Sequence, residues 1–540
     1  MSCCGGRSCG YDIPKVPVSS RYPIPAAQLE SKNNKSLWKQ AENASPQFDA
    51  YPLNFDQKGS TDDLPYTFVG DNLAAVDFPL GGFGCGNVCL HGDGTLQRWT
   101  MVNKTLPEGN ADVMPANFFG ISVTPDDDKQ QAFVLQSPQN FDSNKHLPQH
   151  RPAAVAPSSL QRLQDLPGIK SLSLTGKYPI AEVDYEIPGL PVEVSLEAFT
   201  PLIPNDTKNS SLPVAMFEFT LKNPTESAVT VRVMQAQQNL IGWDGKTDVN
   251  STNVTPFWGS NVNTPFVQPD GLAGLSMSSQ KYDATDPSFG TLTVACSPGE
   301  WATAKVITQA TDETDLWNQF TSGTFQDPAT APATAPSASG ASWCGAAVQE
   351  IKLAANETAT VSFIMAWHFP NRTQVDSFGN NWPSASFASI FPNDIIGNYY
   401  TTFFADASAA AAYTLANRDY LCKYTRAYRD LMYGSSVPWQ LLECAAGRVA
   451  VMRSPTMFRA QNGVVLGCEG NSCCPVNCSH VYGYTTLMER VLPDLAKDMR
   501  ITDFVRAFDA SRNGVLYIRV IRVIGSHRDD FCLFLLLLYI

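Results

Sequence analysis

Short alternating or apolar runs recur between residues 118 and 370, and this pattern predicts a region built from β-strands. Turn sequences such as Asn223-Pro224-Thr225 and Ser297-Pro298-Gly299 separate the runs. Many short strands with proline and glycine between them, and almost no helical periodicity, are typical of an antiparallel β-sandwich. The predicted strands are 118–123, 171–174, 181–187, 192–199, 214–221, 229–235, 290–295, 348–353 and 360–367.

The pattern changes to helical spacing at about residue 405. Leu415, Tyr420, Tyr424 and Tyr428 recur on one face of a predicted helix. Pro438 opens a second predicted helix over 439–452, and a third spans 485–500 with an interruption at Pro493. Strands followed by helices predict two domains, β first and α second.

Four segments follow from this pattern. Residues 1–65, rich in Pro, Ser, Asn and Lys, predict a flexible or wrapping N-terminal arm. We place the sandwich at 66–404 and the helical domain at 405–510. The tail at 511–540 has neither helical amphipathicity nor turn sequences, and is interpreted as translated non-coding sequence. A short hydrophobic anchor is the alternative, although its apolar end is too short to span a bilayer.

Two further features of the sequence concern local structure. Residues 326–342, rich in Pro, Ala, Thr and Ser, predict a surface loop or insertion. Glycines at 81, 82, 84 and 86 could suggest a dinucleotide-binding loop, but no helix pattern follows them. A bulged strand against which another backbone packs closely is the favoured interpretation.

Composition excludes several classes of protein. Hydrophobic residues make up 44% and charged residues 16%, as in a globular chain. The formal charge is 38 − 51 = −13, which disfavours nucleic acid and anionic membranes as partners. Aromatic residues reach 11%, which suits either sugar-stacking platforms or an ordinary core. The N-terminus lacks the apolar stretch of a secretory signal and no run is long enough for a membrane span, so we expect a cytoplasmic protein, with secretion as the alternative.

Reactive side chains are densest between residues 459 and 504. Glu469 lies between Cys468 and Gly470 in a loop poor in other charge. Few neighbouring residues could therefore pair with its carboxylate in a structural role. Glu469 is the preferred catalytic carboxylate, and an ordinary surface-loop glutamate is the alternative. Glu443, on an apolar helix, is the second candidate, although a paired helix carboxylate explains it as well. The cysteines in this stretch and His480 have a spacing that fits no standard zinc site, so we predict no metal; the cysteines are Cys473, Cys474 and Cys478.

Four stretches, in order, resemble glycoside hydrolase family 116, the family of the non-lysosomal glucosylceramidase and of microbial β-glucosidases. The resemblance implies a β-sandwich packed on an (α/α)6 toroid, and retaining hydrolysis of β-glucosides without a cofactor. The helices after 405 would then be the first of an incomplete catalytic toroid. The four stretches are FPLGGFGCGNVCLHGDGTLQRWTMVN (78–103), AFTPLIPNDTKNSSLPVAMFEFTLKNP (198–224), SFIMAWHFPNR (362–372) and SPTMFRAQNGVVLGCEGNSCCPVNCSHVYGYTTLMERVLPDLAKDMR (454–500).

The resemblance also implies roles for individual residues. Glu469 occupies the nucleophile position, and His480 and Tyr482 would contact the sugar. Tyr482-Gly483 departs from the Trp-Asn pair common in microbial relatives. The family's acid/base is an aspartate further downstream, which we expect to be absent from this C-terminally truncated chain. Asp494, Asp498 and Asp503 are not expected to replace it, because they fall on or just after a helix face predicted to be solvated.

The predicted partner is a β-glucoside or a glycolipid, with membrane contact only through a lipid substrate. Without the acid/base we expect this polypeptide alone to lack measurable β-glucosidase activity. A non-catalytic sandwich that binds carbohydrate or a protein partner, and a fragment that does not fold stably, are the alternatives. The sequence leaves the aglycone, the choice between glucose and xylose, and the oligomeric state open.

Overall fold

The structure is a computed structural model, and the residues it describes all lie within Pro65–Ile540. The predicted N-terminal arm and nearly all of the predicted tail lie outside the described residues. These are 66–103, 114–126, 129–137, 165–245, 247, 249, 255–297, 299, 302–373, 391, 393–454, 457–467, 488–502, 508–509 and 515–516.

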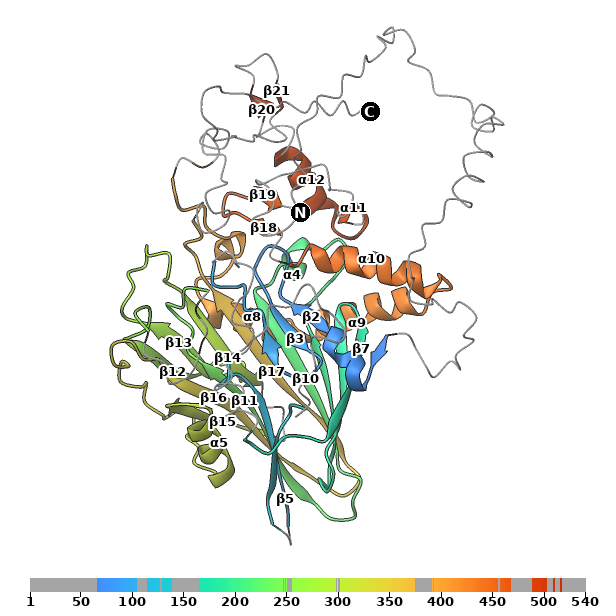
Figure 1. Ribbon diagram of the computed structural model, residues 1–540, viewed down its shortest axis with the longest axis vertical. Coiled ribbons are helices and arrows are strands. Elements are labelled where there is room, and N and C mark those ends of the chain that lie inside the picture. The colour runs from blue at the N-terminus through green and yellow to red at the C-terminus, as the bar shows by residue number, and fades with distance from the viewer. Residues whose placement is uncertain are drawn as a thin grey trace. The chain divides into compact units, whose positions relative to one another are not determined.

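Two antiparallel sheets form the β-rich part of the chain (Figure 1). The larger has nine strands, in the order β1 (Thr67–Phe68), β7 (Ser171–Lys177), β8 (Ile180–Glu186), β9 (Glu193–Phe199), β10 (Val214–Lys222), β17 (Thr358–His368), β14 (Thr291–Ser297), β13 (Ala273–Ser279) and β12 (Asn261–Val267). The smaller has five, in the order β15 (Ala302–Ala310), β16 (Cys344–Leu353), β11 (Val229–Gln238), β5 (Phe119–Pro125) and β6 (Gln131–Val134). Each strand predicted between 118 and 370 coincides with one of these strands, which confirms the β-rich first part of the chain.

Aromatic side chains join the two sheets across their shared core. Phe119 of β5 contacts Phe217 and Phe219 of β10, with ring centroids 4.8 and 5.1 Å apart. Valines on alternate positions of β11 are buried in the same core, as the two-residue period of a strand requires. Helix α5 (Glu313–Ser322) packs its buried face on β15 and β16. It begins at Asp312, whose side chain accepts a hydrogen bond from the N–H of Asp315.

The predicted surface loop at 326–342 forms no helix or extended strand and is mostly exposed. The loop lies along β12, an edge strand of the larger sheet. Thr334 and Ser337 exchange backbone and side-chain hydrogen bonds of 2.9–3.0 Å with Asn263 and Asn261 of β12. Edge strands otherwise present unpaired backbone groups to solvent, so this loop completes the hydrogen bonding of β12.

Helices follow the sandwich, as the sequence predicts. Asn417 divides the first predicted helix into two, because its backbone leaves the helical conformation. The third predicted helix is interrupted at Leu492, and a helix begins again at Pro493. Proline is well tolerated at the first position of a helix. The helical elements are η4 (Tyr399–Thr402), α8 (Ala407–Ala416), α9 (Arg418–Tyr433), α10 (Trp439–Val451), α11 (Met488–Val491) and α12 (Pro493–Ile501).

Smaller elements complete the described chain. A three-stranded sheet contains β2 (Asp77–Leu80), β3 (Val88–His91) and β4 (Leu96–Gln97), and it follows the short helix η2 (Gly70–Ala75). A hairpin pairs β18 (Met457–Arg459) with β19 (Val465–Gly467). Helix α4 (Thr207–Ser210) and the strand pair β20 (Phe508–Asp509) and β21 (Val515–Leu516) are the remaining elements. Within the described residues, none of the helices has both the length and the apolar character needed to cross a bilayer.

Candidate functional site

The sequence-predicted site residues Glu469, His480 and Tyr482 lie outside the residues that the structure describes. The cysteines Cys473, Cys474 and Cys478 do as well. The structure does describe both flanks of this segment. The chain enters it from β19, which ends at Gly467, and leaves it into α11, which begins at Met488. The candidate site is therefore built from the elements that hold these two ends.

The hairpin β18–β19 and helix α12 hold each other. The guanidinium of Arg459, at the end of β18, forms an ion pair with Asp498 of α12. The N–H of Val465 in β19 donates a hydrogen bond of 3.3 Å to Oγ1 of Thr502, immediately after α12. Met457 shares a buried apolar cluster with residues of α12, among them Leu495 and Met499. The two flanks of the predicted catalytic segment are thus joined by a charge pair, a hydrogen bond and apolar packing.

The glycine-rich stretch lies between β2 and β3 and packs closely against backbone, as predicted. A Cβ atom added to Gly82 would lie 2.6 Å from the backbone nitrogen of Leu212. One added to Gly84 would lie 2.6 Å from the backbone nitrogen of Arg459, and Gly84 also has a φ of +69°. Only glycine fits such distances without a shift of the neighbouring chain. The stretch is a turn between β2 and β3 and not a bulged strand, and it sets the sandwich against the β18–β19 hairpin.

Three buried arginines surround this turn, each stacked on an aromatic ring. Arg372 lies over Phe458, with its guanidinium carbon 4.8 Å from the ring centroid. Arg453 lies 5.1 Å from the centroid of Phe83. Arg459 lies 3.5 Å from the centroid of Tyr399. Guanidinium groups suit such positions because they stack on aromatic faces and are only weakly hydrated.

Arg453 binds backbone carbonyl groups. Its side chain donates hydrogen bonds to the carbonyl oxygens of Thr200 and Ser210, at 3.0 and 3.3 Å, and to that of Pro201. It follows α10 in the chain, so these bonds attach the end of that helix to the loop after β9 and to the end of α4. Its position is structural, because its donors are directed at backbone.

Cys85, in the glycine-rich turn, is a buried thiol and not a nucleophile. Burial raises its pKa, and the guanidiniums of the three arginines only partly oppose that effect. Its Sγ–H donates to the carbonyl oxygen of Ser211 at 3.0 Å. A reactive cysteine needs a lowered pKa and access to solvent, and this thiol has neither.

A second buried network connects the sandwich to the helical part. Asn398 Nδ2 donates to Asn103 Oδ1 at 2.6 Å and to the Phe369 carbonyl oxygen at 2.8 Å. Arg372 Nε donates to Asn398 Oδ1 at 2.9 Å, and the N–H of Phe369 donates to the Tyr400 hydroxyl at 2.9 Å. Sequence patterns did not identify this network, because only the fold brings Asn103, Asn398 and Tyr400 together.

The other carboxylates that the sequence raised have structural partners or are exposed. Glu443 Oε1 accepts a hydrogen bond of 3.3 Å from the Tyr433 hydroxyl, and partial burial raises the Glu443 pKa. Asp494 is exposed on α12, and Asp503 lies outside the described residues. Asp498 corrects the expectation of a solvated face, because it is partly buried in its ion pair with Arg459.

Where the structure describes the residues, no three His, Cys, Asp or Glu side chains gather as a metal site would require. The prediction of no metal at 473–480 stays a prediction, because that segment lies outside the described residues.

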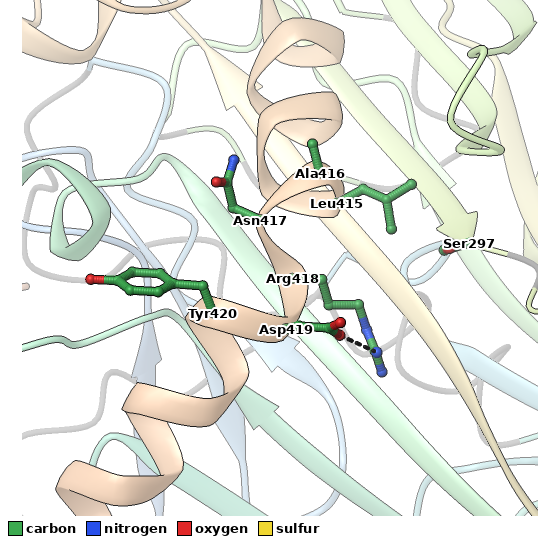
Figure 2. A pocket seen from close by; sticks show the side chains of 7 residues that line it. All are labelled: Ser297, Leu415, Ala416, Asn417, Arg418, Asp419 and Tyr420. Carbon is green, nitrogen blue, oxygen red and sulfur yellow. Dashed lines mark ion pairs between the residues drawn. The ribbon is translucent and has the colours of Figure 1, made fainter.

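A pocket of about 460 Å³ lies at the junction of α8 and α9, away from the hairpin (Figure 2). Leu415 lies on the side of the helix that faces Ser297, and Arg418 is paired with Asp419, while Tyr420 points to the opposite side of the helix (Figure 2). Arg418 is paired with the buried carboxylate of Glu218. The pocket therefore offers no pair of facing carboxyl groups, and it is not a candidate for glycosidic chemistry.

Comparison with known proteins defines the class of this chain. A family model matches residues 77–421, which contain the glycine-rich turn, most of the sandwich and helix α8. That model is described as beta-glucosidase 2, glycosyl-hydrolase family 116 N-term. The chain belongs to glycosyl-hydrolase family 116, as the resemblance predicts.

Solved structures show weaker likeness. A human-microbiome protein assigned as a kojibiose phosphorylase is 10% identical, with a TM-score of 0.34 over 82% of this chain and 49% of that chain. The GH92-family glycosyl hydrolase ccman5 is 11% identical, with a TM-score of 0.26 over 74% of this chain and 48% of that chain. This chain spans about half the length of each, and at these TM-scores the likeness carries no argument about fold or function.

Proposed function

We propose that this chain belongs to a retaining glycosidase that hydrolyses β-glucosides, either simple glucosides or glycolipids of the glucosylceramide type. The observation that carries the proposal is the family 116 match over 77–421, with Glu469 following it in the chain. Helices α8 to α12 would then be the first helices of an (α/α)6 toroid. The segment boundaries at 66, 405 and 511 are part of the same proposal.

Retaining hydrolysis assigns a defined step to Glu469. Its ionised carboxylate attacks the anomeric carbon, forming a glycosyl ester as the bond to the aglycone oxygen breaks. A second carboxylic acid protonates the departing oxygen and then removes a proton from the water that cleaves the ester. His480 and Tyr482 would contact the sugar. No residue of this sequence is assigned as that acid.

The test therefore uses a step that needs no acid. A 2,4-dinitrophenyl 2-deoxy-2-fluoro-β-glucoside carries a leaving group that departs without protonation, and its fluorine slows hydrolysis of the ester. The whole chain should gain the mass of one fluoroglucosyl group, and peptide mapping should locate it on Glu469. Glu469→Gln should abolish the label, whereas Glu443→Gln should leave it unchanged.

Other outcomes separate the alternatives. A label on a different carboxylate would overturn the assignment of Glu469. Absence of any label would remove support for covalent catalysis by this chain. Glucoside binding without a label, measured by calorimetry, would instead support a non-catalytic carbohydrate-binding sandwich.

A further inference from the structure

We propose that an exposed aromatic surface on helices α8 and α9 and the residues just before them binds a neutral carbohydrate chain. This aromatic surface consists of four rings, those of Phe403, Tyr413, Tyr420 and Tyr424. None of them belongs to the segment that carries Glu469. The inference therefore goes beyond the proposed catalysis and does not depend on it.

Polar side chains of α4 connect the first two rings. Lys208 Nζ lies 5.4 Å from the ring centroid of Phe403 and 4.3 Å from that of Tyr413, so its ammonium group is within cation–π distance of both. The Tyr413 hydroxyl donates a hydrogen bond of 3.0 Å to Asn209 Oδ1. Rings that follow the sandwich are thus held beside polar groups that belong to the sandwich.

Asp206, at the start of α4, continues the surface to α9. Its Oδ2 accepts a hydrogen bond of 2.6 Å from Asn209 Nδ2 and one of 3.1 Å from the Tyr420 hydroxyl. Tyr424 follows Tyr420 by one helical turn, and the two ring centroids are 4.7 Å apart. Desolvation and the adjacent Asp206 carboxylate raise the pKa of Tyr420, so its phenol stays protonated and remains a donor.

The rings are held open to solvent. Phe403, Tyr420 and Tyr424 are 42%, 42% and 43% exposed, whereas α9 buries Leu421 and Cys422 against the core. Tyr420 projects away from the pocket at the junction of α8 and α9 (Figure 2). Tyrosine loses little conformational entropy when it is covered, because it has only two side-chain torsions. An aromatic surface fixed in this way can accept a partner without rearrangement.

The area of the surface favours a sugar over a protein. At these exposures the three most exposed rings offer roughly 250 Å² of aromatic area. A stable protein interface needs about 800 Å² from each partner, so these rings supply only a minor part of one. The same area matches a few sugar units.

The chemistry of the surface points to the same partner. A pyranose has a flat face of C–H groups that stacks on aromatic rings, and a rim of hydroxyls that bond to phenol, amide and carboxylate groups. Both kinds of group occur together here, because Asp206 and Asn209 bond to the hydroxyls of Tyr420 and Tyr413. Lys208 and Asp206 carry opposite charges, which suits a neutral chain.

The experiment titrates the whole chain with cellotetraose, a neutral β-linked oligosaccharide, by isothermal titration calorimetry. Tyr420→Ala and Tyr424→Ala should each weaken binding about tenfold or more, because each removes roughly 85 Å² of apolar contact area. Tyr424→Phe keeps the ring and should bind within about threefold of the unmodified chain. Trp439→Ala is the matched control, because it removes a ring of similar exposure, 41%, on α10. Its affinity should be unchanged.

Each result decides the inference. No detectable binding of cellotetraose would overturn it, as would binding that Tyr420→Ala and Tyr424→Ala leave unchanged. Thermal melting identifies a loss caused by unfolding, and Phe403→Ala provides a second route if an α9 variant does not fold.

Two further measurements address other partners. Tighter binding of tetragalacturonic acid, an acidic chain of the same length, would overturn the assignment of a neutral sugar. Self-association in sedimentation that is lost in Tyr424→Ala, with cellotetraose binding intact, would assign the surface to a second copy of this chain instead. Binding does not require labelling by the fluoroglucoside, so failure of the proposed catalysis and failure of this inference are separate results.

Discussion

Three asparagines show how single residues fix this fold. Asn239, Asn261 and Asn263 are fully buried at one end of the sandwich. Asn239 Nδ2 donates to Asn263 Oδ1 and Asn261 Nδ2 donates to Asn239 Oδ1, each at 3.1 Å. Backbone groups complete their bonding: the Asn239 amide donates to the Ser278 carbonyl oxygen at 2.9 Å, and its oxygen accepts from the Ile241 N–H at 3.1 Å. Buried amides are favourable only when paired in this way.

We expect Asn239→Leu to destabilise the chain by about 2–5 kcal/mol, because each buried partner left unpaired costs about 1–3 kcal/mol. Urea unfolding followed by tryptophan fluorescence measures the change. Asn318→Leu, at an exposed position on α5, is the matched control and should stay within about 0.5 kcal/mol. Equal effects of the two substitutions would show that the asparagine set does not stabilise the sandwich.

His368 gives the fold a pH dependence of defined sign. It is buried, and Nε2 lies 3.0 Å from the carbonyl oxygen of Phe404, which can only accept. Burial lowers the His368 pKa, with partial opposition from that hydrogen bond and from Asp406. The unfolded chain therefore binds the proton more readily than the folded chain does. The contribution of neutral His368 to the free energy of unfolding is fully present above about pH 6.5, the ordinary histidine pKa. It falls as the pH drops below that value.

The test compares the chain with His368→Gln, in which the side chain can still donate a hydrogen bond but cannot titrate. When the pH is lowered from 7.5 to 5, the urea midpoint should fall further in the unmodified chain than in the variant. The other histidines and the carboxylates are present in both proteins, so the difference reports His368. Equal falls would show that this histidine does not couple protonation to folding.

At the scale of elements, helix α9 is attached to the larger sheet by charge. Glu182, Glu197 and Glu218 stand directly opposite one another on the adjacent strands β8, β9 and β10. Such a row of like charges would destabilise the sheet. Arginines of α9 neutralise it: Arg418 pairs with Glu218, Arg426 with Glu197, and Arg429 with Glu182 and Glu197.

Arg429→Met should destabilise the chain by about 2 kcal/mol, between the values typical of exposed and of buried pairs. The side chain of Arg429 is only 13% exposed, so removing it leaves two carboxylates without that partner. Urea unfolding at low ionic strength measures the loss. Lys222→Met, which breaks an exposed pair with Glu193, should cost less than about 1 kcal/mol. A loss no larger than that of Lys222→Met would contradict a stabilising role for the arginines that pair with the glutamate row.

Sequence patterns predicted many of the strands of this fold, and one strand that they missed has polar residues at buried positions. The strand β12 was missed because Asn261 and Asn263 occupy buried positions that alternation assigns to apolar residues. Their burial depends on Asn239 and on the loop at 326–342, which are distant in sequence. The break at Asn417 was missed for a related reason, because the helical spacing continues across it.

The candidate site shows the same limit at the scale of the molecule. Glycines at 82 and 84 predicted close backbone packing, but nothing in the sequence pattern identifies Leu212 and Arg459 as the partners. The three arginines around the turn belong to separate segments, and only their burial beside aromatic rings connects them. The reactive segment itself was located from sequence and family resemblance, and its roles stay predictions.

The strands and the helices share their cores, which bears on how the whole molecule unfolds. One buried cluster contains Phe217 and Trp367 of the sheets with Val449 and Leu495 of the helices. A second contains residues of β10 and β17 together with residues of α8 and α9. Elements that bury one another's apolar faces lose that burial together. The predicted boundary near 405 thus separates two patterns in the sequence that are coupled in the fold.

We expect the described helices and the larger sheet to open as one cooperative unit. Native-state hydrogen exchange in low urea, followed by mass spectrometry, should give opening free energies within about 1 kcal/mol for peptides from α9 and from β10. In the double variant Arg426→Met/Arg429→Met, peptides from α9 should lose protection first, because the charge pairs to the glutamate row are removed while the sheet core is untouched. Lys222→Met should leave both sets of peptides coupled. If α9 already exchanges well before β10 in the unmodified chain, the helices and the sandwich are energetically separate, and the boundary near 405 is a boundary of stability as well as of sequence.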